Sequence, residues 1–271
     1  MTPSYQSLVW AQQVKKFITN KYTLICLGII LLIGLWFLAT LIFDKNSMIF
    51  PSPIVTLDAM IKLLGLAYTY QCLGFSILKM LIGFGMAFII AFILALIVRD
   101  DERLYIVMSP IMTALKAIPT AAVVFLFVVL VKAQYAPCFL VTIISLPILY
   151  ESLVNGMRNI DQQVLDAVRI DGGKGIRKVV RIQLPLAMPY LIVGIISSFS
   201  LSFKIEIMSE IVTGYTRNGL GSLIKAAQVN DPTNMAVIFA YSLIAILLMI
   251  IVSIPASYIK DKVAVKAGIS R

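Results

Sequence analysis

Four polar residues recur at intervals of four along one apolar segment of the chain: Ser198, Ser202, Glu206 and Glu210. If this segment is an α-helix, the spacing places all four side chains on one face. Hydroxyl and carboxylate groups on such a face can line a path for a polar solute, or they can join the helix to its neighbours. The spacing leaves both interpretations open. If this face has a role beyond helix packing, we expect it to line a translocation path.

The chain lacks the residues on which most catalytic and metal sites depend. It has no histidine, and its three cysteines, Cys26, Cys72 and Cys138, are far apart. This excludes histidine-based acid–base catalysis and predicts neither a metal site nor a disulfide framework. The segment 172–175 superficially resembles a phosphate-binding loop, but Val168 and Gly175 break the required pattern. We therefore expect no catalytic residue, no metal and no bound cofactor in this chain.

The composition is that of an integral membrane protein. Apolar residues make up 60% of the chain and charged residues 13%, against about 45–50% and about 25% in soluble domains. The mean hydropathy is +0.97. The apolar runs predict an all-α, polytopic fold with six transmembrane helices in a single membrane domain, 24–271, preceded by a cytoplasmic segment, 1–23. The predicted spans are 24–43, 72–98, 109–131, 136–150, 186–203 and 235–259. The first is expected to be a retained span rather than a cleaved signal peptide.

The distribution of positive charge predicts the orientation. The net charge is +10, and most lysines and arginines precede the first span, follow the last or lie in the segment 151–185. Because cytoplasmic loops of membrane proteins are enriched in these residues, both termini are expected in the cytoplasm. On the outer side, the segment 53–64 carries apolar residues at helical spacing and predicts a short amphipathic helix.

The segment 151–185 has the pattern of a helix hairpin on the cytoplasmic side. Apolar residues recur at helical spacing on both sides of Asp171-Gly172-Gly173, where glycine favours a turn. Pro185 follows where the next span begins. Such a hairpin can present its apolar faces to a cytoplasmic partner.

This loop resembles the EAA motif of ABC importer permeases. Asp166-Ala167-Val168, three residues, Gly172, nine residues and Ile182-Gln183-Leu184-Pro185 reproduce its spacing, with Asp for Glu and Val for the second Ala. Three further segments are similar to the nitrate/taurine/sulfonate branch of that family. They are Phe50-Pro51-Ser52-Pro53, Lys116-Ala117-Ile118-Pro119, and Ser209-Glu210 followed by Gly219-Leu220-Gly221-Ser222-Leu223-Ile224. The resemblance extends over about residues 50–260.

The resemblance implies a permease subunit of a type I importer in the cell inner membrane. Two permease subunits, as an expected homodimer, would form the path for a small anionic solute such as nitrate, taurine or a sulfonate. An external binding protein would deliver the solute, and two cytoplasmic ATPases would bind ATP and Mg²⁺. The residues implied in ATPase coupling are Val164, Asp166, Ala167, Val168, Gly172, Ile182, Leu184 and Pro185.

Three other classes are weighed against this interpretation. A polytopic membrane enzyme is disfavoured by the absence of histidine, of paired cysteines and of clustered carboxylates. A membrane component of a vitamin-uptake system would carry Ala-Arg-Gly triplets, whereas this loop has Ala167-Val168-Arg169. An ABC exporter half lacks the EAA spacing. Lys79, Lys116 and Lys204 can favour an anion, or they can extend to the membrane interface.

Overall fold

The computed structural model describes residues 21–43, 50–160, 163, 182–214 and 218–266, and in these ranges it is helical without strands. The helices are α2 (Lys21–Phe43), α3 (Pro53–Leu64), α4 (Ala67–Val98), α5 (Glu102–Ala117), α6 (Thr120–Leu130), α7 (Ala136–Arg158), α10 (Leu184–Thr213), α11 (Leu220–Asn230) and α12 (Met235–Lys266). The predicted all-helical fold is confirmed for this part of the chain.

Four helices are long and apolar enough to cross a bilayer, judged over the described residues. They are Thr23–Ile42, Ala67–Val98, Ala136–Arg158 and Leu184–Thr213. In addition, α12 contains a shorter apolar stretch, Met235–Ile251. These match five of the predicted spans in position, although α7 and α10 continue well beyond the predicted 136–150 and 186–203. A total of six membrane crossings remains a prediction.

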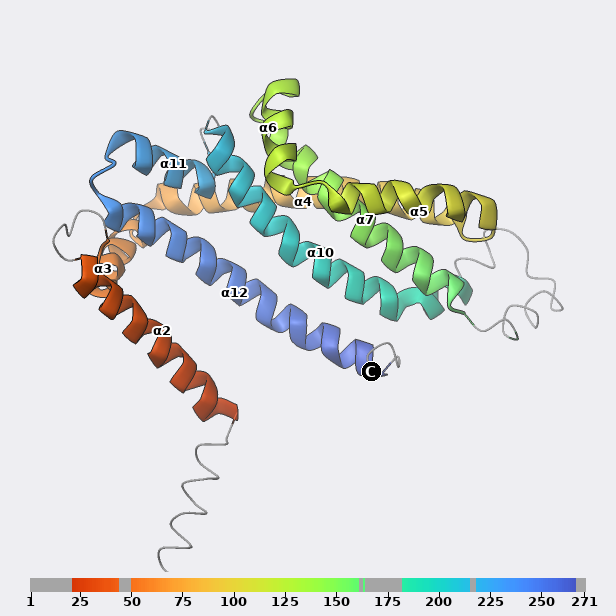
Figure 1. Cartoon of the computed structure of the whole chain (residues 1–271), viewed down its shortest axis with the longest axis horizontal. Coiled ribbons are helices and arrows are strands. Elements are labelled where there is room, and N and C mark those ends of the chain that lie inside the picture. Colours follow the sequence, from red (N-terminus) through yellow and green to blue (C-terminus); the bar gives the residue numbers. More distant parts are fainter. Residues whose placement is uncertain (1–20, 44–49, 161–162, 164–181, 215–217, 267–271) are drawn as a thin grey trace, which may run out of the picture.

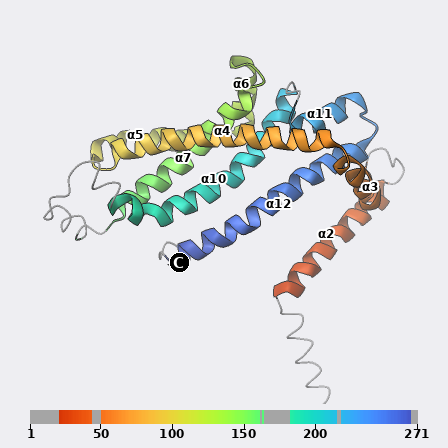
Figure 2. The same ribbon diagram turned by 180° about the vertical axis from the view of Figure 1, so that it is seen from behind.

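The predicted span 109–131 is divided into two helices. α5 ends at Ala117, Ile118 is extended with φ −67° and ψ 126°, and α6 begins after Pro119. A residue that precedes proline is disfavoured in the α conformation, which explains the break at Ile118. Figures 1 and 2 both show α6 leaving the direction of α5 at this point.

The centre of the fold is the packing of α7 against both α4 and α10. Ala87, Ala91 and Ala95 lie at intervals of four along α4 and are fully buried. Glycines complete these contacts: Gly194 of α10 faces Ser152, and Gly156 of α7 faces Ala187 and Tyr190. Small side chains allow membrane helices to approach closely, so the three helices form one packed layer.

The predicted helix 53–64 is present as α3. The hydroxyl of Ser52 accepts a hydrogen bond from the backbone N–H of Val55 at 3.4 Å, and Pro53 occupies the first turn, where proline is tolerated. Met60 and Leu64 pack with the core formed by α11 and α12. Other apolar residues of α3, including Ile54 and Ile61, are exposed.

α2 stands apart from the other helices in Figures 1 and 2. None of its described side chains is buried. Trp36 connects α2 to the rest of the chain. Its indole N–H donates to the carbonyl of Pro51 at 3.2 Å, and its ring centroid lies 6.3 Å from that of Phe239. A helix this apolar on all sides requires lipid or another membrane helix around it.

Candidate functional site

The polar stripe lies on a single continuous helix, because α10 runs from Leu184 to Thr213 without a break. Ser198, Ser202, Glu206 and Glu210 are all fully buried within the chain. The prediction that they share one helical face is confirmed. Their assignment to a translocation path stays a prediction, and their contacts within the chain differ from one residue to the next.

The two serines are bonded to protein groups. The hydroxyl of Ser198 donates to the carbonyl of Gly194 and that of Ser202 to the carbonyl of Ser198, both at 2.7 Å. The hydroxyls of Ser202 and Ser145 also lie 2.7 Å apart, which joins α10 to α7. These contacts satisfy the buried hydroxyls and hold two helices together.

Glu210 is the centre of a charged network that connects three helices. One carboxylate oxygen accepts from the ammonium of Lys79 at 2.8 Å. The other accepts from the hydroxyl of Ser76 at 2.8 Å and from the backbone N–H of Gly221 at 2.9 Å. Lys79 also donates to the carbonyl of Asn218 at 2.8 Å. Both α4 and α10 are therefore tied to the segment that leads into α11.

The network also satisfies the start of α11. The hydroxyl of Ser76 accepts from the backbone N–H of Leu220 at 2.8 Å, beside the bond from Gly221 to Glu210. The first N–H groups of a helix have no partner inside it, and the helix dipole favours negative charge there. Ser76 of α4 and Glu210 of α10 thus supply acceptors for the first two of these N–H groups, those of Leu220 and Gly221.

Two glycines make this approach possible. A Cβ atom at Gly219 would overlap the carboxylate of Glu210, and one at Gly221 would lie 2.5 Å from the carbonyl oxygen of Ile207. The structure thus gives a physical reason for the glycines at 219 and 221 after the Ser209-Glu210 pair.

Glu206 lies one turn before Glu210 and differs from it. Its carboxyl faces that of Glu210, with Lys79 and Cys138 nearby, and neither of its oxygens has the geometry of a hydrogen bond with a described residue. A buried polar group of this kind is costly. In the sequence the two glutamates differ in one respect: Glu210 belongs to the Ser209-Glu210 segment that is similar to the family, and Glu206 does not.

Two ion pairs link α5 to α7. Lys116, one residue before the end of α5, lies 2.6 Å from Glu151 of α7, and both side chains are more than one-third exposed. At the other end of α5, Glu102 pairs with Arg158, whose guanidinium also stacks over Tyr105 at 4.2 Å. The sequence places Lys116 in the predicted span 109–131 but does not predict its ion pair with Glu151.

The loop implied in ATPase coupling falls mostly outside the described residues. Val164, Asp166, Ala167, Val168 and Gly172 are not described. Ile182, Leu184 and Pro185 are: Ile182 lies two residues before Leu184, the first residue of α10, and Pro185 lies in the first turn of that helix. The described ends of the loop are the end of α7 and the start of α10, which lie together away from α11 (Figure 1). The role of these eight residues stays a prediction.

Comparison with known proteins identifies the family. Residues 83–265 match the family described as "Binding-protein-dependent transport system inner membrane component". The chain is 28% identical over 211 residues to the putative aliphatic sulfonates transport permease protein SsuC of Escherichia coli, covering 76% of this chain and 78% of that protein. It is 31% identical over 123 residues to the riboflavin transport system permease protein RibX of Chloroflexus aurantiacus, a match that covers 45% of each.

The fold is also found among solved structures. An inward-facing structure of the MetNI methionine ABC transporter superposes with a TM-score of 0.56 and 17% sequence identity, over 72% of this chain and 94% of that one. This likeness concerns the helical arrangement. The family match covers most of the chain and includes α10, α11 and most of α12. The chain belongs to the binding-protein-dependent transport system inner membrane components, which makes it a multi-pass inner-membrane permease of an ABC importer and not an enzyme.

Proposed function

We propose that this permease forms the path by which a small organic anion crosses the membrane, with import driven through the loop 151–185. The observation that carries the coupling role is the EAA-like spacing of Asp166, Gly172 and Ile182-Gln183-Leu184-Pro185 in a chain that belongs to the importer family. The two described ends of this loop belong to α7 and α10, the helices that also carry the buried serine contact. Movement of the loop would therefore act directly on the central packed layer.

The proposed assembly contains two copies of the permease, two cytoplasmic ATPases and an external binding protein. ATP and Mg²⁺ would be bound by the ATPases, and this chain would hold neither. An anionic solute is supported by two relatives that are named aliphatic sulfonates transport permeases. Support also comes from Lys204 of α10, which has no ion pair with a described residue.

The coupling role predicts that Gly172→Val uncouples the permease from its ATPase. A turn with positive φ at Gly172 would cost about 1 kcal/mol for alanine and more for a β-branched residue. The variant is expected to reach the membrane in normal amount, to lose most of the co-purifying ATPase, and to lose uptake. Pull-down of tagged permease from membranes, with permease abundance measured in the same samples, tests this.

Asp166→Ala provides the comparison within the same loop. It is expected to have a milder effect, because Asp166 already departs from the family's Glu and orients the helix rather than filling the ATPase groove. Recovery of wild-type amounts of ATPase with Gly172→Val, together with normal uptake, would show that this loop is not the coupling element.

The proposed orientation, with both termini in the cytoplasm, predicts which residues face outward. In a variant without Cys26, Cys72 and Cys138, single cysteines introduced at Lys62 and Arg217 should react with an impermeant thiol reagent added to intact cells. A cysteine at Arg177 should react only after the cells are opened. Labelling of position 177 from outside would overturn this topology.

A further inference from the structure

Lys204 differs from the other two lysines found in the apolar segments. Lys79 is paired with Glu210, and Lys116 is paired with Glu151. Lys204 is exposed on α10, and within the described residues it has no hydrogen bond or ion pair. It is thus a cation of a membrane-spanning helix that lacks a counter-charge in the part of the chain that the structure describes.

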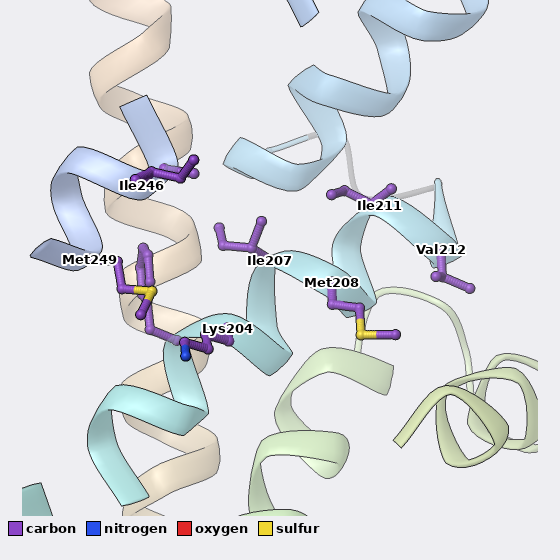
Figure 3. Close-up of a pocket in the computed structure, with 9 residues that line it drawn as sticks. Lys204, Ile207, Met208, Ile211, Val212, Ile246 and Met249 are labelled. Atoms are coloured by element: carbon purple, nitrogen blue, oxygen red, sulfur yellow. The ribbon is translucent and has the colours of Figure 1, made fainter. Parts of the chain in front are cut away.

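The surface around Lys204 is a hollow with apolar walls. It has a volume of about 310 Å³ and lies between α10 and α12. Figure 3 shows Ile207, Met208 and Ile211 along α10, and Ile246 and Met249 on α12. Lys204 is the charged residue of this lining, so the hollow combines one positive charge with an extended apolar surface.

Lys204 lies within α10 rather than in its last turn. Thr213, the last residue of the helix, is nine positions further along, which corresponds to about 14 Å along the helix axis. A charged side chain inside a hydrocarbon layer is costly, and such groups normally face a protein or a water-filled cavity. An anion that binds Lys204 would reduce this cost.

A second copy of the chain does not provide that anion from the described residues. Glu206 and Glu210 are fully buried, and Glu151 is paired with Lys116. The remaining described acidic residues lie in the outer helix α3 or close to helix ends: Asp58, Asp100, Asp101, Glu102, Asp231 and Asp261. The described residues thus offer no free carboxylate in the middle of a membrane-spanning helix, and we expect the counter-charge from a ligand.

We propose that this hollow is a subsite of the translocation path for an amphiphilic organic anion, whose acidic group binds Lys204 and whose hydrocarbon part contacts Ile207, Met208 and Met249. This proposal rests on the proposed function and specifies its substrate class. A charge-assisted hydrogen bond in an apolar setting is stronger than a neutral one, and the apolar walls select an anion with a hydrocarbon group over nitrate or sulfate.

The test uses the complete transporter, with its ATPase and binding protein, in vesicles of phosphatidylcholine. A cysteine replaces Met208 in a permease without the three native cysteines, and its reaction with a methanethiosulfonate reagent is followed. 1-Butanesulfonate is expected to slow the reaction, and 1-butanol is not. In Lys204→Gln the concentration of butanesulfonate that halves the rate should rise roughly tenfold or more, whereas Lys204→Arg should stay near the parent value.

Lys132→Gln, which removes an exposed lysine outside the hollow, is the matched control. It should leave unchanged the protection that butanesulfonate gives the cysteine at 208 against the thiol reagent. Equal protection in Lys204→Gln and its parent would overturn the subsite. So would a cysteine at 208 that never reacts, which would mean that a second subunit covers the hollow. Protection by phosphatidylglycerol in the vesicles without butanesulfonate would assign the site to lipid and would also overturn it.

Uptake of butanesulfonate and of further alkanesulfonates is measured in the same vesicles, so that the subsite and the proposed function are judged separately. Protection that depends on Lys204, in a transporter that imports none of these anions, would support the subsite and contradict import of this substrate class. If Lys204→Gln imports these anions normally and butanesulfonate does not protect the cysteine at 208, the subsite is contradicted. The proposed importer function would not be affected by this result.

Discussion

Replacing Glu210 with alanine is expected to destabilise the permease by about 3–5 kcal/mol, the cost of removing one partner from a buried ion pair. The ammonium of Lys79 would keep only the carbonyl of Asn218, and the N–H of Gly221 would lose its acceptor. Because Glu210 is fully buried, water cannot replace the lost carboxylate without local opening. The start of α11 should therefore loosen before the central layer does.

The measurement is the unfolding of purified permease in detergent, by heat or by increasing denaturant, with Glu151→Ala as the matched control. Glu151 also pairs with a lysine, but its side chain and that of Lys116 are more than one-third exposed. Its loss is expected to cost no more than about 1 kcal/mol. Equal stability of the two variants would mean that the Glu210 network does not hold α11.

A double-mutant cycle separates the ion pair from the cap on α11. Glu210→Gln retains the shape of the side chain and one acceptor oxygen but leaves Lys79 charged. Adding Lys79→Met removes that buried charge and should recover part of the lost stability. A double variant as unstable as the sum of its parts would show that Lys79 and Glu210 act independently.

The apolar runs of the sequence were sufficient to predict most of the membrane helices. The run 24–43 became α2, and the segments around 72–98, 136–150 and 186–203 became the cores of α4, α7 and α10. These predictions succeed because a hydrocarbon layer demands a long apolar helix, which is a local property of the chain. The break at Ile118 also had a local cause in Pro119, although the run of apolar residues around it suggested a single span.

The partners of Glu210 could not be predicted in this way. Ser76 and Lys79 lie more than one hundred residues earlier, and Gly221 lies 11 residues later, in the first turn of α11. No periodicity in a single sequence connects such positions. The segment Ser209-Glu210 distinguishes Glu210 from Glu206 in the sequence, but only the fold shows that, among the described residues, Glu210 receives hydrogen bonds and Glu206 does not. The unpaired state of Lys204 likewise becomes visible only when α10 and α12 are placed side by side.

The second large effect is expected at Gly83, where the backbones of α4 and α7 lie in close contact. A Cβ atom at this position would overlap the carbonyl oxygen of Cys138 and lie 2.9 Å from the Cβ of Val141. The hydroxyl of Thr142 also donates to the carbonyl of Gly83 at 2.9 Å, which requires the two backbones to stay close. Because the obstructing atom belongs to the backbone of a packed helix, it cannot move aside as a side chain would.

Gly83→Val is therefore expected to separate α4 from α7, to break the bond from Thr142, and to cost about 3 kcal/mol. Gly85→Val is the control, since the same substitution two residues later on the same helix meets nothing within 4 Å. Detergent unfolding midpoints and permease abundance in membranes should fall for Gly83→Val and stay close to wild type for Gly85→Val. If both variants behave alike, the close contact between α4 and α7 does not limit the stability of the central layer. If Gly83→Val alone is unstable, the glycine is required for α7 to hold the buried contacts that connect α4 to α10.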